Sequence, residues 1–329
     1  MRQARWTETG IELIEADPPP LRDGWVRLRV SACGICGSDL HLYRRELPPV
    51  PGWVPGHEVA GTLLDGPPDE LYAVEPRSWC GDCDLCHSGR RHLCPQGAVF
   101  GLTVPMGGLG DTIDVPPASI HPVDPGIPPV VASMAEPLAV CVRAVHLARL
   151  ESASRVLILG GGTIGLLCGL LAREFAAEVA ITVRHPHQRE VATKLGLLAL
   201  AEKEADAWAA DRGPDVVIET VGGRAETLGD AVRLCRVAGR VVVLGVFAGD
   251  RPVNALLLMM KELTVVGSNT YGTDRRGSEF RTACEMLRRH REEIAMLQTH
   301  RFSLEELLDA FRCAADKRTG AIKVTIVPG

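Results

Sequence analysis

The feature that most constrains the fold is a glycine-rich turn within residues 155–177, RVLILGGGTIGLLCGLLAREFAA. The apolar run before the turn is typical of a strand, and the segment after it has an amphipathic helix pattern. Gly160 lets the strand reverse sharply, Gly162 lets backbone amides approach a pyrophosphate, and Gly165 lets helix and strand pack closely. The helix N-terminus adds N–H groups and a positive dipole end. A dinucleotide site is therefore predicted at Gly160, Gly162, Thr163, Ile164 and Gly165.

The alternative is a plain glycine-rich turn in an α/β domain, and the segments that follow bear on this choice. A helix is expected over His187–Leu195. Further strands are expected in EVAITV (178–183), DVVIET (215–220), GRVVVLGV (239–246) and LTVVGSN (263–269). Alternating strands and helices of this kind predict an α/β fold with a Rossmann-type, doubly wound parallel sheet.

The end of the second strand bears on which dinucleotide binds. An Asp or Glu there would hold the adenosine ribose hydroxyls of NAD. This sequence has Val183, followed by Arg184. Loss of the carboxylate removes repulsion against a 2′-phosphate, and an arginine can pair with that phosphate. We therefore favour NADP over NAD, the alternative being that Arg184 is an exposed residue at the start of a helix.

Four cysteines lie within fifteen residues: Cys80, Cys83, Cys86 and Cys94. A tetrahedron of thiolates is the ligand set of a structural zinc, with no open position for chemistry. Two disulfides or free thiols are the alternatives, but a reducing cytosol disfavours disulfides. His87 and His92 lie in the same loop and are expected to be solvated, because four thiolates complete the zinc shell.

Composition limits the class of protein. The chain has 329 residues and a net charge of −5, so neither nucleic acid nor an anionic membrane is an expected partner. The N-terminal twenty residues lack the apolar core of a signal peptide. The longest apolar run considered, Ala255–Met260, is far shorter than the roughly 18 residues of a membrane span. We therefore expect a cytoplasmic protein.

Metal-ligand residue types also occur in the N-terminal region. Cys36 lies in CGICGSDLH, His57 and Glu58 in PGHEVAG, and Glu136 in AEPLAV. Cysteine, histidine and carboxylate are ligands of a catalytic zinc that keeps one position open. Each residue alone could be ordinary core, but together with the cysteine loop and the dinucleotide turn they favour a catalytic metal site.

These motifs resemble the zinc-dependent alcohol dehydrogenases of the medium-chain dehydrogenase/reductase superfamily. Ser38 and the segment EPLAV look like its polyol, threonine and sugar dehydrogenase branch. The motifs occur in the family's order and span most of the chain: Cys36-Gly37-Ser38-Asp39 with His41, Gly56-His57-Glu58, the four cysteines, Glu136-Pro137-Leu138 and the turn Gly160–Gly165.

The resemblance implies a β-rich, chaperonin-10-like (GroES-like) catalytic domain at 1–136 and a Rossmann domain at 137–270. It implies a C-terminal segment, 271–329, that returns to the catalytic domain. Ser303 and Glu306 form an expected capping box that opens a helix at Leu304. The resemblance also implies Glu136 in the region of the third zinc ligand, with Glu58 coordinating directly or through water.

The implied activity is hydride transfer between NAD(P) and a secondary alcohol of a polyol, sugar or related small molecule, which gives the ketone. Zinc would polarise the alcohol oxygen. Ser38 would accept the hydroxyl proton, and His41 would pass it toward solvent through the cofactor ribose. Asp39 would hydrogen-bond His57 and fix its tautomer. Two zinc ions per chain and a homo-oligomer, dimer or tetramer, are expected.

One departure from the family pattern lies between Glu58 and Trp79, where the chain is shorter than usual and lacks a Gly-Asp-Arg-Val turn. This departure puts the shape of the substrate pocket in question. Two alternatives belong to other classes: a zinc-free, NADPH-dependent reductase relative, and a non-catalytic zinc-ribbon binding module. The ligand set argues against the first, and the acidic net charge argues against the second.

Overall fold

The computed structural model describes residues 1–274 and 277–329, and its described residues form two compact units. The first unit comprises Met1–Ala139 and Gly272–Gly329, and the second comprises Val140–Tyr271. Residues 275 and 276 belong to the expected C-terminal segment and lie outside the described residues. The expected domain ranges stay a prediction, because compactness alone does not show that a unit folds independently.

The second unit contains a six-stranded parallel sheet with the order β12-β11-β10-β13-β14-β15. Its strands are β10 (Arg155–Leu159), β11 (Glu178–Thr182), β12 (Leu198–Leu200), β13 (Val216–Glu219), β14 (Arg240–Val243) and β15 (Thr264–Gly267). β10 and β13 are buried along their whole length, as is usual for parallel strands covered on both faces. The strand order reverses between β10 and β13, so the predicted Rossmann class is confirmed.

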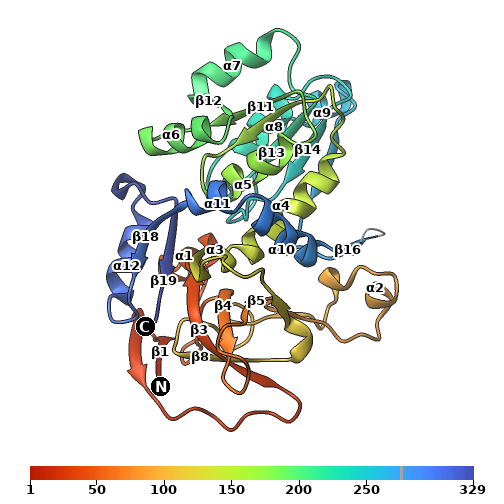
Figure 1. Cartoon of the computed structure of the whole chain (residues 1–329). Coiled ribbons are helices and arrows are strands. Elements are labelled where there is room, and N and C mark those ends of the chain that lie inside the picture. The colour runs from red at the N-terminus through yellow and green to blue at the C-terminus, as the bar shows by residue number, and fades with distance from the viewer. Residues whose placement is uncertain (275–276) are drawn as a thin grey trace. The chain divides into compact units, whose positions relative to one another are not determined.

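The helices that accompany this sheet in Figure 1 are α5 (Thr163–Ala172), α6 (Pro186–Lys194), α7 (Glu202–Ala210), α8 (Thr227–Leu234) and α9 (Ala255–Met260). Of these, α5, α6, α7 and α8 pack against its strands, and α9 packs against α8. α5 was expected to be amphipathic, and this is wrong: every residue from Gly165 to Ala172 is buried, because the helix packs against β10, β11 and β13. β12 was missed, since three residues are too few to show a strand pattern.

The first unit is rich in short strands, as the GroES-like prediction requires. Its largest sheet has the order β18-β19-β3-β4-β5-β9, with β8 also paired to β3. The strands of the unit are β1 (Arg2–Trp6), β2 (Ile11–Glu15), β3 (Val26–Gly34), β4 (Glu58–Leu63), β5 (Leu71–Val74), β6 (Arg77–Ser78), β7 (Ala98–Val99), β8 (Thr112–Val115), β9 (Ile120–Pro122), β16 (Thr273–Asp274), β17 (Gly277–Ser278), β18 (Gln298–Phe302) and β19 (Lys323–Ile326). The shortened stretch after Glu58 forms the antiparallel β4–β5 pair.

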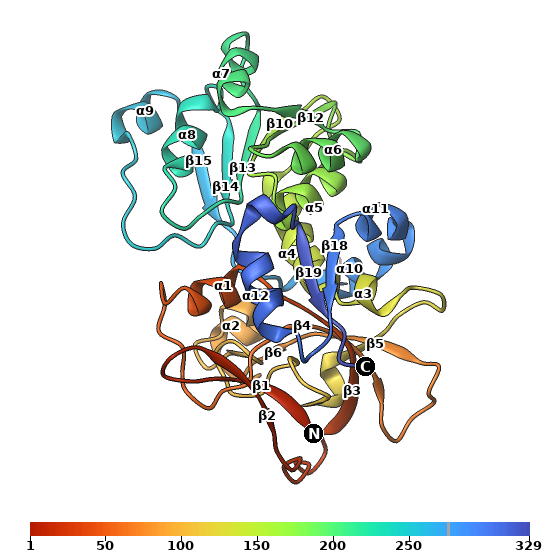
Figure 2. The same ribbon diagram turned by 90° about the vertical axis from the view of Figure 1, so that its left-hand side faces the viewer.

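The C-terminal segment joins this sheet, because β19 pairs with β3 and α12 packs against β19 (Figure 2). The unit's helices are α1 (Gly37–Tyr43), α2 (Asp84–His87), α3 (Pro129–Ala132), α10 (Glu279–Arg289), α11 (Arg291–Ala295) and α12 (Leu307–Ala315), and α4 (Ala135–Ala148) begins in it. α12 begins three residues later than predicted. Of the expected capping box, one hydrogen bond is present: the backbone N–H of Ser303 donates to the Glu306 carboxylate at 2.8 Å.

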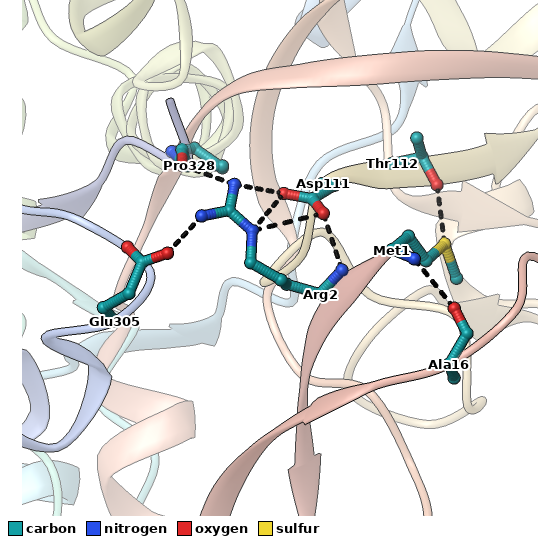
Figure 3. Close-up of polar contacts among 7 residues, drawn as sticks. All are labelled: Met1, Arg2, Ala16, Asp111, Thr112, Glu305 and Pro328. Atoms are coloured by element: carbon teal, nitrogen blue, oxygen red, sulfur yellow. Dashed lines mark hydrogen bonds and ion pairs between the residues drawn. The ribbon is translucent and has the colours of Figure 1, made fainter.

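Arg2 links the N-terminal strand to two other parts of the first unit (Figure 3). Its guanidinium donates to the Asp111 carboxylate at 2.7 Å and to the Pro328 carbonyl at 2.9 Å, and it pairs with Glu305. Burial alone would raise the pKa of Asp111, but the bonds from Arg2 hold that pKa below its usual value. The two ends of the chain are therefore fastened within one unit.

One helical stretch, Pro129–Ala148, has the length and mean hydropathy (1.5) of a membrane span, which corrects the expectation that no run would. The stretch comprises α3 and α4, and most of its residues lie in α4. Of its most apolar window, 78% is buried inside the protein, which is how the core helix of a globular protein passes the same test.

Candidate active site and structural metal centre

The predicted ligands Cys36, His57 and Glu58 come together where β3 and β4 pair. Gly34, near the end of β3, lies opposite Glu58, the first residue of β4. Cys36 lies two positions after Gly34 and directly precedes the first residue of α1. One ligand atom from each of the three side chains lies within 4.8 Å of the others. The sheet register thus brings together residues that are about twenty positions apart in sequence.

The residues after Cys36 surround His57. Ser38 Oγ lies 3.3 Å from His57 Nε2, and Asp39 Oδ1 lies 3.8 Å from His57 Nδ1. Asp39 Oδ2 accepts the backbone N–H of Cys36 at 2.9 Å. The distance from Asp39 to the imidazole is that of an ion pair and is too long for the predicted hydrogen bond. Asp39 nevertheless faces the Nδ1 side, so Nε2 is the nitrogen on the side of Ser38.

Charge in this cluster favours a bound cation. Burial alone would lower the pKa of His57, but Asp39 and Cys36 raise that pKa well above its usual value. Asp39 Oδ1 and His57 Nδ1 are buried without a hydrogen-bond partner. A thiol, an imidazole and a carboxylate are also a donor set that zinc accepts. The residues therefore fit a metal ion at this position.

Glu58 has a cationic partner that no sequence motif predicts. Lys323, on β19, forms an ion pair with the Glu58 carboxylate and donates to the carbonyl of Ile35 at 3.0 Å. The side chains of Lys323 and Glu58 are only 3% and 1% exposed. Burial alone would lower the pKa of Lys323, but Glu58 and Cys36 raise it above its usual value. Glu58 is therefore neutralised by Lys323.

Glu136, on α4, is buried but lies outside the group of three ligands. Burial raises the pKa of its carboxyl to about 7; Glu58 adds to the rise, and His57 opposes it. Lys323 and Arg77 also act on this carboxyl. Glu136 is therefore close enough to share the electrostatic field of the cluster without being gathered into it.

His41 lies on α1 with its imidazole Nδ1 paired to the Glu46 carboxylate. Glu46 was not singled out in the sequence, because a lone glutamate five residues after a histidine carries no motif. Both side chains are partly exposed, at 18% and 25%. The His41–Glu46 pair therefore lies where the side chains of α1 reach solvent.

The four cysteines of the loop between β6 and β7 have their sulfurs close together. Cys80 lies 3.9 Å from Cys86 and 3.5 Å from Cys94, and Cys83 lies 3.8 Å from Cys94. Four sulfurs held at about 2.3 Å from one zinc would be about 3.8 Å apart. A disulfide needs about 2.05 Å, and all four cysteines are free. The loop therefore fits a closed tetrahedral metal site.

Backbone amides also suit this loop for thiolates. The N–H of Asp82 donates to Cys80 Sγ at 3.5 Å, and such bonds lower the pKa of Cys80 to about 6. His87 is exposed, as predicted, but His92 is buried, which corrects the expectation that both are solvated. The His92 ring packs against Gly272, and its carbonyl accepts a hydrogen bond from Arg77 at 2.8 Å.

The glycine turn of the second unit has the geometry that the sequence predicted. Gly160 has φ +107°, and a side chain at Gly165 would overlap the carbonyl oxygen of Gly160. A Cβ at Gly162 would meet nothing within 4 Å, so its face is open. Gly162 caps α5, whose first residues are Thr163 and Ile164. The turn therefore presents an open helix N-terminus of the kind that binds phosphate.

Val183 is buried at the end of β11, and its side chain lies against Gly161. Arg184 is exposed and donates from Nε to Glu202 at 2.6 Å. The Gln188 side chain accepts the backbone N–H groups of Arg184 and His185 at 3.0 and 3.2 Å. The backbone after β11 is therefore fixed, while the Arg184 side chain is held only by a surface ion pair.

Comparison with known proteins decides the family. Residues 22–125 match the alcohol dehydrogenase GroES-like domain, and residues 163–289 match the zinc-binding dehydrogenase family. L-galactonate-5-dehydrogenase of Escherichia coli (strain K12) is 30% identical over 305 residues, 88% of this chain and 87% of the relative. The chain belongs to the zinc-type alcohol dehydrogenases. Sorbitol dehydrogenase of Bacillus subtilis (strain 168) is 30% identical over 96% of this dehydrogenase and 94% of the relative.

A solved structure agrees with this identification. A protein from Sinorhizobium meliloti 1021, described as a zinc-binding dehydrogenase bound to NADP, has a TM-score of 0.86 and 30% identity, with 99% of each chain covered. The dehydrogenase therefore uses zinc and a nicotinamide cofactor and acts on small-molecule alcohols. Both alternatives, the zinc-free reductase and the non-catalytic module, are set aside by its membership of a zinc-dependent enzyme family.

Proposed function

We propose that this dehydrogenase oxidises a secondary alcohol of a polyol, sugar or related small molecule to the ketone, with Cys36, His57 and a glutamate holding the catalytic zinc. The observation that carries the proposal is the group of half-buried Cys36 with buried His57 and Glu58, and with Ser38 against His57. The relatives named for galactonate and sorbitol support the substrate class.

The chain's own residues suit the proton side of this reaction. Bound zinc would supply Lewis-acid polarisation of the alcohol oxygen, and a bound nicotinamide would supply the hydride acceptor. Ser38 lies on the Nε2 side of His57, so its hydroxyl can take the substrate proton. His41 and Glu46 provide a partly exposed pair that can hand this proton to water. Asp39 faces the Nδ1 side of His57 and would favour the neutral tautomer that leaves Nε2 free to hold the metal.

The third protein ligand is proposed to be Glu136, with Glu58 as the alternative. Glu58 is already paired with Lys323 in the interior, so drawing it to a metal would leave the lysine charge unpaired. Glu136 has no such close ion pair among the described residues. Metal content and turnover of Glu136→Gln and Glu58→Gln test this choice. Loss of the catalytic zinc in E58Q but not in E136Q would reverse it.

We propose that NADP is preferred over NAD. The absence of a carboxylate at Val183 and the presence of Arg184 support the preference. Glu202 holds Arg184 in the described structure, and a 2′-phosphate would compete for the same guanidinium. Affinity measurements with NADPH and NADH, on the wild type and on Arg184→Ala, test the preference. Tighter binding of NADH by the wild type would contradict it.

A second zinc at the four cysteines, a homo-oligomer and a cytoplasmic location complete the proposal. Sulfur spacing supports the second zinc. The edge strand β15 and the helix α9, where Leu256, Met259 and Met260 are more than 60% exposed, support self-association. Free cysteines support a reducing compartment. Sedimentation at several concentrations tests the assembly; a monomer throughout would refute it.

Substrate class is tested by a cofactor-reduction screen over polyols, sugars, amino alcohols and simple alcohols with NADP and NAD. We expect activity on compounds that carry a secondary alcohol next to further hydroxyl groups. Because the shortened β4–β5 region alters part of the first unit, the screen includes bulky as well as small polyols. Activity on primary aliphatic alcohols alone would contradict the proposed substrate class.

A further inference from the structure

Glu219, the last residue of β13, is a fully buried carboxylate whose function the sequence motifs do not explain. Its Oε1 accepts the backbone N–H groups of Val221 and Gly222 at 2.8 and 3.0 Å and the Thr227 hydroxyl at 2.7 Å. Its Oε2 accepts the backbone N–H of Gly245 at 3.2 Å. Four donors converge on one buried side chain. Removing this acceptor would leave buried N–H and O–H groups without a partner, which lowers the free energy of unfolding.

The three backbone donors come from two loops at the carboxyl ends of neighbouring strands, and the Thr227 hydroxyl comes from the first residue of α8. Val221 and Gly222 follow β13, and Gly245 follows β14. Beyond the carboxylate, the same loops bond directly, since the N–H of Gly223 donates to the carbonyl of Val246 at 2.7 Å. Glu219 therefore connects the two loops through one acceptor group.

The first of these loops forms a wall of the glycine turn. A Cβ on Gly160 would meet Val221 Cγ2 at 2.7 Å and Thr220 Oγ1 at 3.0 Å. The Thr220 hydroxyl donates to the Leu159 carbonyl at 2.8 Å. Thr220 Oγ1 would also lie 3.0 Å from a Cβ on Gly165. The position of the turn that receives the pyrophosphate is thus set partly by the loop that Glu219 holds.

We propose that Glu219 is a positioning residue for dinucleotide binding. By accepting N–H groups from both loops, it fixes Val221 against the glycine turn and keeps the carboxyl edge of the sheet shaped for the cofactor. The sheet reverses strand order between β10 and β13, so this edge is where a Rossmann sheet binds its ligand. The inference rests on the proposed use of a nicotinamide dinucleotide and goes beyond it by naming the residue that orders the site.

The test compares variants at opposite ends of the same strand. Glu219→Gln keeps the size of the side chain, but its amide has only one acceptor oxygen. The amide NH2 group must then face either the N–H of Gly245 or the three donors that now bind Oε1, and two donors in contact cannot form a hydrogen bond. Asp215→Asn is the matched control: Asp215 precedes β13, accepts the N–H of Arg155 at 2.6 Å and pairs with Arg236. Titrations with NADPH and with NADH, followed by cofactor fluorescence, give the dissociation constants, and a thermal melt gives the stability.

Both variants are expected to lower the melting temperature, but only E219Q is expected to weaken NADPH binding, by about tenfold or more. In turnover assays, E219Q should raise the KM for NADP far more than it lowers kcat. Equal NADPH affinity of E219Q and wild type would overturn the inference, as would equal weakening by D215N.

A second variant keeps the test decisive if E219Q does not fold. Thr227→Val removes one donor to the carboxylate while preserving shape, so it should weaken NADPH binding in the same direction by about threefold. Unchanged affinity in T227V would then overturn the inference. If the wild type bound neither NADPH nor NADH, the proposed function would fail, and the inference with it; wild-type binding with unaffected variants would refute the inference alone.

Discussion

The two ligand clusters of the first unit contrast in how the chain builds them. The four cysteines are neighbours in sequence, on a loop around α2 that extends from the rest of the unit in Figure 1, and α2 buries no residue. In the cluster of Cys36, His57 and Glu58, the histidine and the glutamate are buried, and the pairing of β3 with β4 brings the three residues together. Loss of metal should therefore loosen the first cluster and leave the second folded.

Charge separates the clusters as well. The four thiols can complete a tetrahedron among themselves, which leaves no position for a substrate. The buried cluster has only three gathered ligands, together with Asp39, Glu136 and Lys323. This cluster has more acidic groups than cations, and the packing of the folded unit keeps these acidic groups close together. The proposed structural metal and the proposed catalytic metal would therefore differ in whether the protein is already folded around the ligands.

The largest effect is expected for Cys36→Ser. A serine hydroxyl does not ionise readily, so the catalytic zinc should be lost and turnover should fall by more than about a hundredfold. The fold and NADPH binding should persist, because β3, β4 and the second unit do not depend on this thiol. Turnover, a thermal melt and NADPH titration check this. Full turnover in C36S would remove the catalytic role of the cluster.

A second large effect is expected for Lys323→Met. It leaves Glu58 as a buried charge without its partner, so the free energy of unfolding should drop by about 3–5 kcal/mol. The double variant Lys323→Met, Glu58→Gln should recover part of that loss, since neither member of this ion pair then carries a charge. Urea denaturation measures both. If K323M were as stable as the wild type, the ion pair would not contribute to holding the buried cluster.

A smaller effect on turnover and a clear one on stability are expected for Cys83→Ser. Opening the tetrahedron releases a loop that has little apolar packing, so the melting temperature should fall by several degrees. Residual turnover should match the folded fraction, because the buried cluster is separate. Loss of turnover with an unchanged melting temperature would show that the cysteine loop takes part in catalysis.

The smallest effect is expected for Asp39→Asn. It keeps the acceptor for the Cys36 N–H but removes the charge that faces His57, so zinc affinity should fall by about tenfold. Competition with a chelator of known affinity measures this, with Asp309→Asn, at an exposed residue of α12 outside both ligand clusters, as the control. Equal zinc affinity in D39N and wild type would limit Asp39 to holding the α1 N-terminus.

Local patterns predicted the fold well where an element is long and its residues are strongly periodic. The strand at β10, the turn at Gly160 and the strand at β14 were read from adjacent residues. β12 was not predicted because it spans only three residues. α5 was predicted to have a polar, exposed face, but tertiary packing buries the helix from Gly165 to Ala172. His92 was wrongly taken as solvated, since its contact with Gly272 joins segments 180 residues apart.

Within the site, the sequence could supply ligand types but not their partners. Cys36 and His57 stand in recognisable motifs, whereas Lys323 is one lysine in an ordinary final strand. Its role depends on β19 lying beside β3, which only the folded sheet establishes. The same holds for Glu219, whose four donors come from two loops and from the start of α8, none of which has a motif of its own.

Zinc analysis of the wild type and C36S, side by side and with NADPH titration, tests the central claim most directly. The account predicts about two zinc ions per wild-type chain and about one in C36S, with equal NADPH affinity and nearly equal melting temperatures. One zinc in the wild type, or two in a C36S variant that turns over normally, would contradict the division into a working and a structural metal.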